Sequence, residues 1–314
     1  MQVIIKNCDE FYNTFKYVES LASEVKVLCQ PEEVWLQVHN PSCTAIAEVK
    51  FPADYFEEYT CEKPVQVGIN TKIFLQILKN TYKKKSVTLK MAASEEEDKM
   101  HISITIDGDE TSGNVQCSYE MKLVDITSDF MNIPDQHVHS KYKLSVETLK
   151  KWKQFLFSDC AYLTFTPEEA ALKIQSENDL KDRLTLTDEI SPLTWHESAE
   201  VTDEETGVTS TIKRKWKAIS IGSVNAKYIF DLMIFSRDVT CQFFIVDAPV
   251  EYFVKLDEGV HIRVFIAPKI SDSDDEEEEE DTVRPPVRAR KRKPVDAPED
   301  AEELNPQKKA VTAH

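Results

Sequence analysis

Residues 118–136 read SYEMKLVDITSDFMNIPDQ, and this stretch decides how the chain is divided. Ile133-Pro134-Asp135 breaks regular structure, because a proline disfavours helical geometry in the residue before it and donates no backbone hydrogen bond. A domain boundary is therefore expected around Asp125–His137. The chain has 314 residues, which is long enough for two ordinary domains with sizeable cores.

Most of the chain before residue 271 consists of short β-branched and aromatic runs, spaced as in antiparallel sheets. Four segments have helical spacing of apolar residues instead: Phe11–Ala22, Ile73–Leu78, Val146–Leu156 and Ala226–Met233. Ile69-Asn70-Thr71-Lys72 resembles Val224-Asn225-Ala226-Lys227, which indicates an internal repeat. The sequence thus predicts an α+β fold of two similar domains, each with two helices on antiparallel sheets.

Charge is distributed unevenly along the chain, whose formal net charge is −18. Residues 271–314 hold 14 Asp/Glu and 8 Lys/Arg, whereas residues 1–270 hold 42 and 30. The last segment combines the acidic run Asp274–Asp281 with a basic cluster and few apolar residues, so we expect it to be disordered. The rest of the chain is acidic, so any contact with nucleic acid must use a local basic surface.

The sequence carries no catalytic motif. With six glycines it has no GxGxxG or Walker-type loop, and neither HExxH nor GxSxG occurs. His137 and His139 alternate in the expected linker, where such a pair is far more often solvated than metal-bound. Seven cysteines without a CxxC pair indicate free thiols in a reducing compartment. We therefore expect a soluble intracellular protein that is not an enzyme and needs neither cofactor nor metal.

Cationic side chains recur on or beside the four helical segments. Basic helix faces on an acidic protein indicate one surface that meets phosphates while the rest repels them. For any single lysine, an ordinary solvated helix face is the alternative. The candidate DNA-binding residues are Lys16, Lys72, Lys79, Lys83, Lys84, Lys85, Lys150, Lys151, Lys153, Lys227 and Arg237.

Several motifs resemble the proliferating cell nuclear antigen family of sliding clamps. Ser118–Asp125 and Asn132–Gln136 look like the last strand of its first domain and its interdomain connector. Ala267-Pro-Lys-Ile270 followed by acids is similar to its C-terminal end, and Phe56–Cys61 and Val67–Lys79 match in order and spacing. The resemblance covers about residues 1–270. It implies a DNA clamp fold with an N-terminal domain 1–123, a connector 124–139, a C-terminal domain 140–270 and a tail 271–314.

The resemblance implies a DNA polymerase processivity factor. Members form homotrimeric rings that encircle duplex DNA without reading its sequence, with the helices lining the hole. A separate clamp loader mounts them, and polymerases and other replication and repair proteins bind through short motifs. The edges that close the ring would be Asn114–Lys122 and a strand within about Asn178–Leu186. The expected location is the nucleus, or a viral replication site if the protein is viral. A monomeric or dimeric non-ring factor and a subunit of a heterotrimeric checkpoint clamp remain alternatives.

The resemblance also implies a hydrophobic pocket for partner peptides beneath the connector. The residues that would form it are His39, Pro41, Ile46, Met131, Ile133, Pro134, Pro249, Phe265, Ala267, Pro268 and Ile270, with Cys43 at the rim. The family often has Met and His where this chain has His39 and Cys43, so its peptide preference is expected to differ.

Two segments fall outside the family pattern. Trp195–Lys217 is longer than usual and strongly charged, and the sequence offers no account of it. The tail carries a basic cluster, Arg288, Arg290, Lys291, Arg292 and Lys293, which favours either a nuclear import signal or an auxiliary DNA-binding arm. A passive solubilising tail is the alternative.

Overall fold

The computed structural model describes residues 1–5, 7–83, 87–93, 98–108, 113–127, 129–156, 160–202, 207–246 and 248–269. The compact folded unit ends at Lys269. The predictions for the tail 271–314 therefore lie outside the described residues.

Four α-helices form at the four segments with helical periodicity: α1 (Cys8–Leu21), α2 (Thr71–Leu78), α3 (Val146–Phe155) and α4 (Ser223–Asp231). Side chains cap three of them. Asn7, Asn70 and Ser145 accept hydrogen bonds from backbone N–H groups in the first turns of α1, α2 and α3, which satisfies donors that have no partner within the helix. The α+β prediction is confirmed.

The largest sheet has nine strands and joins the two halves of the chain. Its spatial order is β14 (Thr194–Trp195), β10 (Val138–Leu144), β18 (Val239–Phe244), β19 (Val250–Lys255), β20 (His261–Ile266), β4 (Ala45–Pro52), β3 (Glu33–His39), β2 (Glu24–Cys29) and β6 (Val65–Asn70). The halves meet where β20 pairs antiparallel with β4, with Phe265 opposite Ile46.

Two smaller sheets flank this one, each formed within one half of the chain. The first has the order β5 (Glu58–Thr60), β1 (Gln2–Ile5), β7 (Val87–Ala93), β8 (Lys99–Ile106) and β9 (Val115–Lys122). The second has the order β13 (Arg183–Asp188), β12 (Leu172–Asn178), β11 (Cys160–Pro167) and β17 (Ile219–Gly222). β9 and β13 each end their sheet, so each leaves one edge without a pairing strand.

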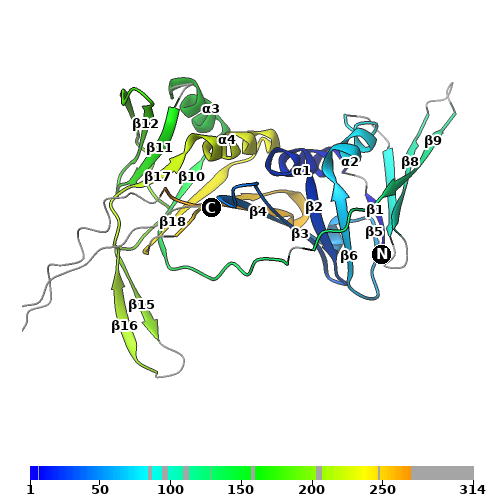
Figure 1. Ribbon diagram of the computed structural model, residues 1–314, viewed down its shortest axis with the longest axis horizontal. Helices are drawn as coiled ribbons and strands as arrows, with labels where there is room; N and C mark the ends of the chain where they lie inside the picture. The colour runs from blue at the N-terminus through cyan, green and yellow to red at the C-terminus, as the bar shows by residue number, and fades with distance from the viewer. Residues whose placement is uncertain are drawn as a thin grey trace, which may run out of the picture. The chain divides into compact units, whose positions relative to one another are not determined.

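The helices lie in a row along one side of the sheets, and the connector runs along the opposite side (Figure 1). Aromatic side chains bind the helices to the sheets. In the first half, Phe11 of α1 lies 5.4 Å from Phe51 of β4, and Phe15 of α1 lies 4.7 Å from Phe74 of α2. In the second half, Trp152 of α3 lies 6.3 Å from Phe165 of β11. Both clusters are fully buried, so each helix is fixed by its apolar stripe.

The proposed four-residue repeat is wrong in its register. Asn70 is the N-cap of α2, whereas Asn225 lies inside α4, which begins at Ser223. The Asn225 side chain is buried and accepts hydrogen bonds from Asn40 Nδ2 and Thr44 Oγ1, both at 3.1 Å. Asn70 completes a helix end and Asn225 ties α4 to the β3–β4 turn, so the two asparagines are not equivalent.

The charged segment Trp195–Lys217 adds structure that the sequence did not reveal. β14 extends the large sheet by pairing with β10, and β15 (Ser198–Thr202) and β16 (Thr209–Lys213) form a separate two-stranded hairpin. The hairpin projects away from the sheets in Figure 1. No described residue in it is buried.

Among the described residues, none of the helices has the length and apolar character that crossing a bilayer requires.

Candidate functional site

The predicted cationic residues that the structure describes are all exposed, and they lie on or next to the helices. Six of them form no ion pair with another described residue: Lys16, Lys72, Lys79, Lys150, Lys153 and Lys227. A lysine without a local carboxylate keeps its full charge available for a phosphate. Lys84 and Lys85 lie outside the described residues.

Four predicted cations have local partners, one of them Lys227, whose Nζ lies 5.0 Å from the centroid of the Tyr228 ring. Lys151 Nζ lies 3.3 Å from Asp188 Oδ1, and Arg237 lies 2.5 Å from Asp257 Oδ2. Lys83 Nζ is 5.2 Å from the centroid of the Tyr82 ring, a cation–π contact. Lys151 and Arg237 are thus partly neutralised by carboxylates, which makes them weaker candidates for phosphate contact than the six lysines without an ion pair.

A groove of about 770 Å³ lies between the connector and the outer face of the large sheet. Six of the predicted pocket residues line it: Ile46, Met131, Ile133, Pro134, Pro249 and Phe265. They come from three distant parts of the sequence, which the β4–β20 pairing and the connector bring together. Apolar side chains around a concave surface are suited to anchoring residues of a short peptide.

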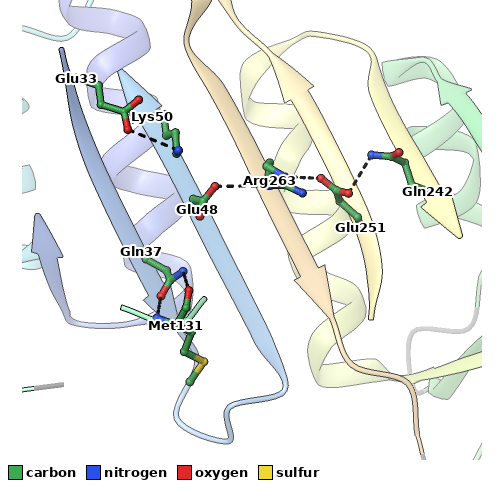
Figure 2. Close-up of polar contacts among 8 residues, drawn as sticks. All are labelled: Glu33, Gln37, Glu48, Lys50, Met131, Gln242, Glu251 and Arg263. Atoms are coloured by element: carbon green, nitrogen blue, oxygen red, sulfur yellow. Dashed lines mark hydrogen bonds and ion pairs between the residues drawn. The ribbon is translucent and has the colours of Figure 1, made fainter. Parts of the chain in front are cut away.

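The connector is fixed to the sheet at its N-terminal end. The Gln37 side chain pairs with the Met131 backbone: its Nε2 donates to the Met131 carbonyl at 2.9 Å, and its Oε1 accepts from the Met131 N–H at 2.6 Å (Figure 2). Next to this pair, the Phe130 ring stacks on Trp35 at 4.4 Å. These contacts hold the connector above β3. They fix the position of Met131 and Ile133, which line the groove, relative to the sheet.

A polar network crosses the sheet beneath the connector. Figure 2 shows Arg263 of β20 between Glu48 of β4 and Glu251 of β19. Arg263 Nε donates to Glu251 Oε1 at 2.7 Å, and its Nη1 lies 3.8 Å from Glu48 Oε1. Gln242 Nε2 donates to the other Glu251 oxygen at 3.0 Å. Burial opposes the charge of Arg263, but the hydrogen bond to Glu251 and the charges of Glu251, Glu48 and Asp135 together raise its pKa.

The remaining predicted pocket residues lie beyond one end of the groove. His39, Pro41, Ala267 and Pro268 do not line it. The Ala267 N–H donates to the Thr44 carbonyl at 2.8 Å, which places this strand end beside the β3–β4 turn. In that turn, Cys43 Sγ lies 3.6 Å from His39 Nδ1. Ile270 lies outside the described residues.

Sequence reasoning missed the part of the groove that faces the second half of the chain. This part contains Val138, Lys141, Leu193, Thr240, Gln242, Phe244, Glu251, Phe253 and Arg263. Glu251 and Arg263 each place a charge among apolar residues of a core strand, and this is the signal that could have marked them. Leu193 lies two residues before the charged segment Trp195–Lys217, and its N–H donates to the Lys141 carbonyl at 2.7 Å.

Comparisons with known proteins agree with this architecture. The family described as "Proliferating cell nuclear antigen, N-terminal domain" matches residues 6–130. The chain is 21% identical to proliferating cell nuclear antigen 2 of Plasmodium falciparum over 58% of its own length and 73% of the relative. It is 22% identical to the Caenorhabditis elegans proliferating cell nuclear antigen, over 82% of its own length and 92% of the relative. By these matches the chain is similar to sliding clamps of the proliferating cell nuclear antigen family.

The fold of the family is also shown by a solved structure. The structure of a PCNA2–PCNA3 complex from Sulfolobus tokodaii superposes with a TM-score of 0.65 at 17% identity, covering 86% of this chain and 99% of that chain. The likeness covers nearly the whole folded unit, including the half that the family match does not reach.

Proposed function

We propose that this protein is a ring-shaped clamp that encircles duplex DNA and recruits replication and repair proteins through the groove beneath the connector. The observation that carries the proposal is the row of helices with six exposed lysines that form no ion pair with any described residue, on an otherwise acidic protein. In a closed ring these helices would line the hole. Contacts to phosphates carry no sequence information and weaken with salt, which suits a protein that slides.

Ring closure would use two of the strands that end a sheet in the described part of the chain. β9 and β13 are unpaired on one side, and edge strands present N–H and C=O groups that can pair with another chain. Because the two edges differ, pairing β9 of one subunit with β13 of the next is head-to-tail, and such an interface closes into a ring when the rotation permits it. We propose a homotrimer.

The clamp would act by tethering. Members of the family are non-enzymatic scaffolds, and we propose that this chain likewise catalyses no reaction and needs no cofactor. Holding a polymerase on the same DNA raises its effective local concentration to roughly the millimolar range. Mounting the closed ring would require a separate clamp loader. The basic cluster Arg288–Lys293 supports nuclear import as a further proposal.

The first measurement is the native mass of the purified protein by light scattering. A species of three times the 36.0 kDa chain is expected. A monomer or dimer would contradict the ring and favour an open clamp that holds DNA by direct charge contacts.

A subunit of a heterotrimer is the second candidate, because the similar solved structure is a complex of two different clamps. That candidate requires a monomer that gains mass only with a second clamp subunit.

The DNA surface is tested by charge reversal. Lys79→Glu, Lys150→Glu and Lys227→Glu together should weaken duplex binding at low salt and reduce the salt slope by about 2 to 3 units, since each phosphate contact contributes ~0.9. The matched control reverses Lys63, Lys213 and Lys255, which are exposed and lie off the helices. Equal loss of binding in both variants would show that net charge, rather than the helix surface, governs binding.

A further inference from the structure

Arg263 in the floor of the groove lies between two buried carboxylates, Glu251 in the floor and Glu48 beside it on β4. Glu251 and Glu48 are 3% and 7% exposed, and both approach Arg263. The second Glu251 oxygen meets the neutral amide of Gln242. Buried carboxylates are stable when a cation balances each of them. Here Arg263 pairs with both, so the cluster of Glu48, Glu251 and Arg263 has a net charge of −1.

The connector adds to this negative charge. Asp135 is exposed and lines the groove, and its carboxylate contributes to the field at Arg263. Lys141 is the other cation of the groove lining, but it forms no ion pair with a described residue. It is also placed two strands from Glu251, because Lys141 pairs with Gln242 and Gln242 pairs with Glu251. Adjacent strands are about 4.8 Å apart, so Lys141 starts roughly 10 Å away.

The negative floor adjoins the apolar part of the groove. Along one row of directly opposed residues, Glu251 faces Phe265, and Phe265 faces Ile46. Directly opposed residues lie on the same face of a sheet, with neighbouring strands about 4.8 Å apart. A segment that seats one side chain over Phe265 can therefore place a neighbouring side chain over Glu251, one strand away.

We infer that the occupant of this groove is a partner segment that places a Lys or Arg side chain beside its apolar anchors, over Glu251 and beneath Asp135 of the connector. The cation completes the neutralisation that Arg263 leaves unfinished. A partner carboxylate is disfavoured at this position, because Glu48, Glu251 and Asp135 already surround the one guanidinium. This inference rests on the proposed function of the groove and names the chemistry of the segment that it binds.

The test uses short synthetic peptides labelled for fluorescence anisotropy. Each carries two adjacent phenylalanines in a neutral polar background, and one flanking position at a time carries Lys, Gln or Glu. At the position that reaches Glu251, Lys should bind about ten-fold more tightly than Gln, which corresponds to one charge-assisted hydrogen bond. Glu at the same position should bind more weakly than Gln.

Three variants locate the effect. Glu251→Gln keeps the hydrogen-bonding shape of the side chain and should reduce the Lys advantage to less than about two-fold. Asp135→Asn, at an exposed position that cannot disturb the core, should reduce it partially. Glu24→Gln removes the same charge from an exposed site at the start of β2 and should leave the advantage intact.

The outcomes separate the two proposals. If Lys and Gln peptides bind equally well to the wild-type protein at every position, the inference is wrong and the peptide groove stands. If the Lys advantage survives in both Glu251→Gln and Asp135→Asn, it arises from the overall negative charge and the inference is also wrong. If no phenylalanine peptide binds at all, the groove is not a peptide site and the proposed recruitment function fails with it.

Discussion

Gly68 and His139 show how single residues set the geometry of the connector and of the charged segment Trp195–Lys217. A Cβ at Gly68 would lie 2.0 Å from the Val124 carbonyl oxygen, and the Val124 N–H donates to the Gly68 carbonyl at 2.9 Å. Only glycine permits this approach, so it fixes where the connector leaves β9.

His139 is fully buried, and its Nε2 lies 3.0 Å from Arg214 Nη1. Since arginine only donates, Nε2 accepts, and Nδ1–H donates to Ser140 Oγ at 2.9 Å.

Gly68→Ala should displace the start of the connector. The added methyl meets backbone, which cannot rotate away as a side chain can, so we expect a loss of about 1–3 kcal/mol in the free energy of unfolding. Urea denaturation measures it. The peptide affinity of the groove should fall as well, because Met131 and Ile133 follow the displaced segment. Unchanged stability and affinity would show that the connector start is not held at Gly68.

His139 should make stability depend on pH. Burial, followed by the charges of Arg214 and His196, lowers its pKa to about 4, whereas the unfolded value is about 6.5. The unfolded state therefore binds the proton more readily, so this contribution is complete above pH ~6.5 and is lost as pH falls through about 4. It amounts to at most about 3 kcal/mol.

The comparison that checks this is the unfolding free energy of the wild type and of His139→Gln across that pH range. The substituted glutamine can still accept from Arg214, but its side-chain amide does not titrate there. The difference between the two proteins should shrink as the pH falls from ~6.5 towards 4, because only the wild type loses this contribution. Parallel pH profiles would contradict a depressed His139 pKa.

At the scale of elements, the charged segment Trp195–Lys217 is bound to the rest of the protein near its two ends, whereas the β15–β16 hairpin between them is exposed. The His196 N–H donates to the His139 carbonyl at 2.7 Å. Arg214 packs over the Trp216 ring at 4.4 Å and donates to the carbonyls of Trp216 and Lys217 at 2.5 and 2.8 Å. The β15–β16 hairpin beyond these contacts has no buried residue among those described. Its order therefore depends on these contacts, since isolated two-stranded hairpins are marginally stable in water.

Arg214→Met should loosen this segment without unfolding the protein. Methionine keeps the apolar stem but leaves the buried His139 Nε2 without a donor, which costs about 1–3 kcal/mol locally. Hydrogen exchange followed by mass spectrometry should show faster exchange at residues 193–202, with β11 and β12 unaffected. Lys213→Met, one residue away at an exposed position, is the matched control. Wild-type exchange in Arg214→Met would mean that pairing with β10 alone anchors the segment.

At the scale of the whole molecule, the proposed ring depends on strand edges that have no partner among the described residues. β9 and β13 lie at the ends of sheets built from different halves of the chain. Leu184 lies on β13 opposite Ser176 of β12 and is half-buried, whereas Leu180 lies in the preceding turn and is 83% exposed. The two leucines thus offer the same chemistry on and off the proposed subunit interface.

Leu184→Asp should convert the trimer to monomers. A carboxylate buried at a subunit interface without a partner costs several kcal/mol, comparable to the margin of many assemblies. Light scattering reports the mass, and Leu180→Asp should keep the wild-type mass because its side chain stays in water. A trimer of Leu184→Asp would exclude β13 from the interface.

The sequence by itself determined the α+β class, the four helices and the break in regular structure at Ile133-Pro134-Asp135. These follow from local information: apolar periodicity fixes which face a helix buries, and a proline ends regular structure wherever it occurs. Ile46 and Phe265 in the groove were predicted from the family resemblance rather than from such patterns.

Tertiary structure alone decided the rest. Glu48, Arg263, Glu251 and Gln242 lie on four different strands, and the pairing of β4 with β20 brings the first two together across more than two hundred residues. Strand order also brings His139 and Arg214 together, 75 residues apart in the sequence. It likewise decides which of the predicted lysines meet a carboxylate, as Lys151 meets Asp188. Whether two charges meet is set by strand order and register, because a shift of one residue would turn each side chain to the other face of the sheet.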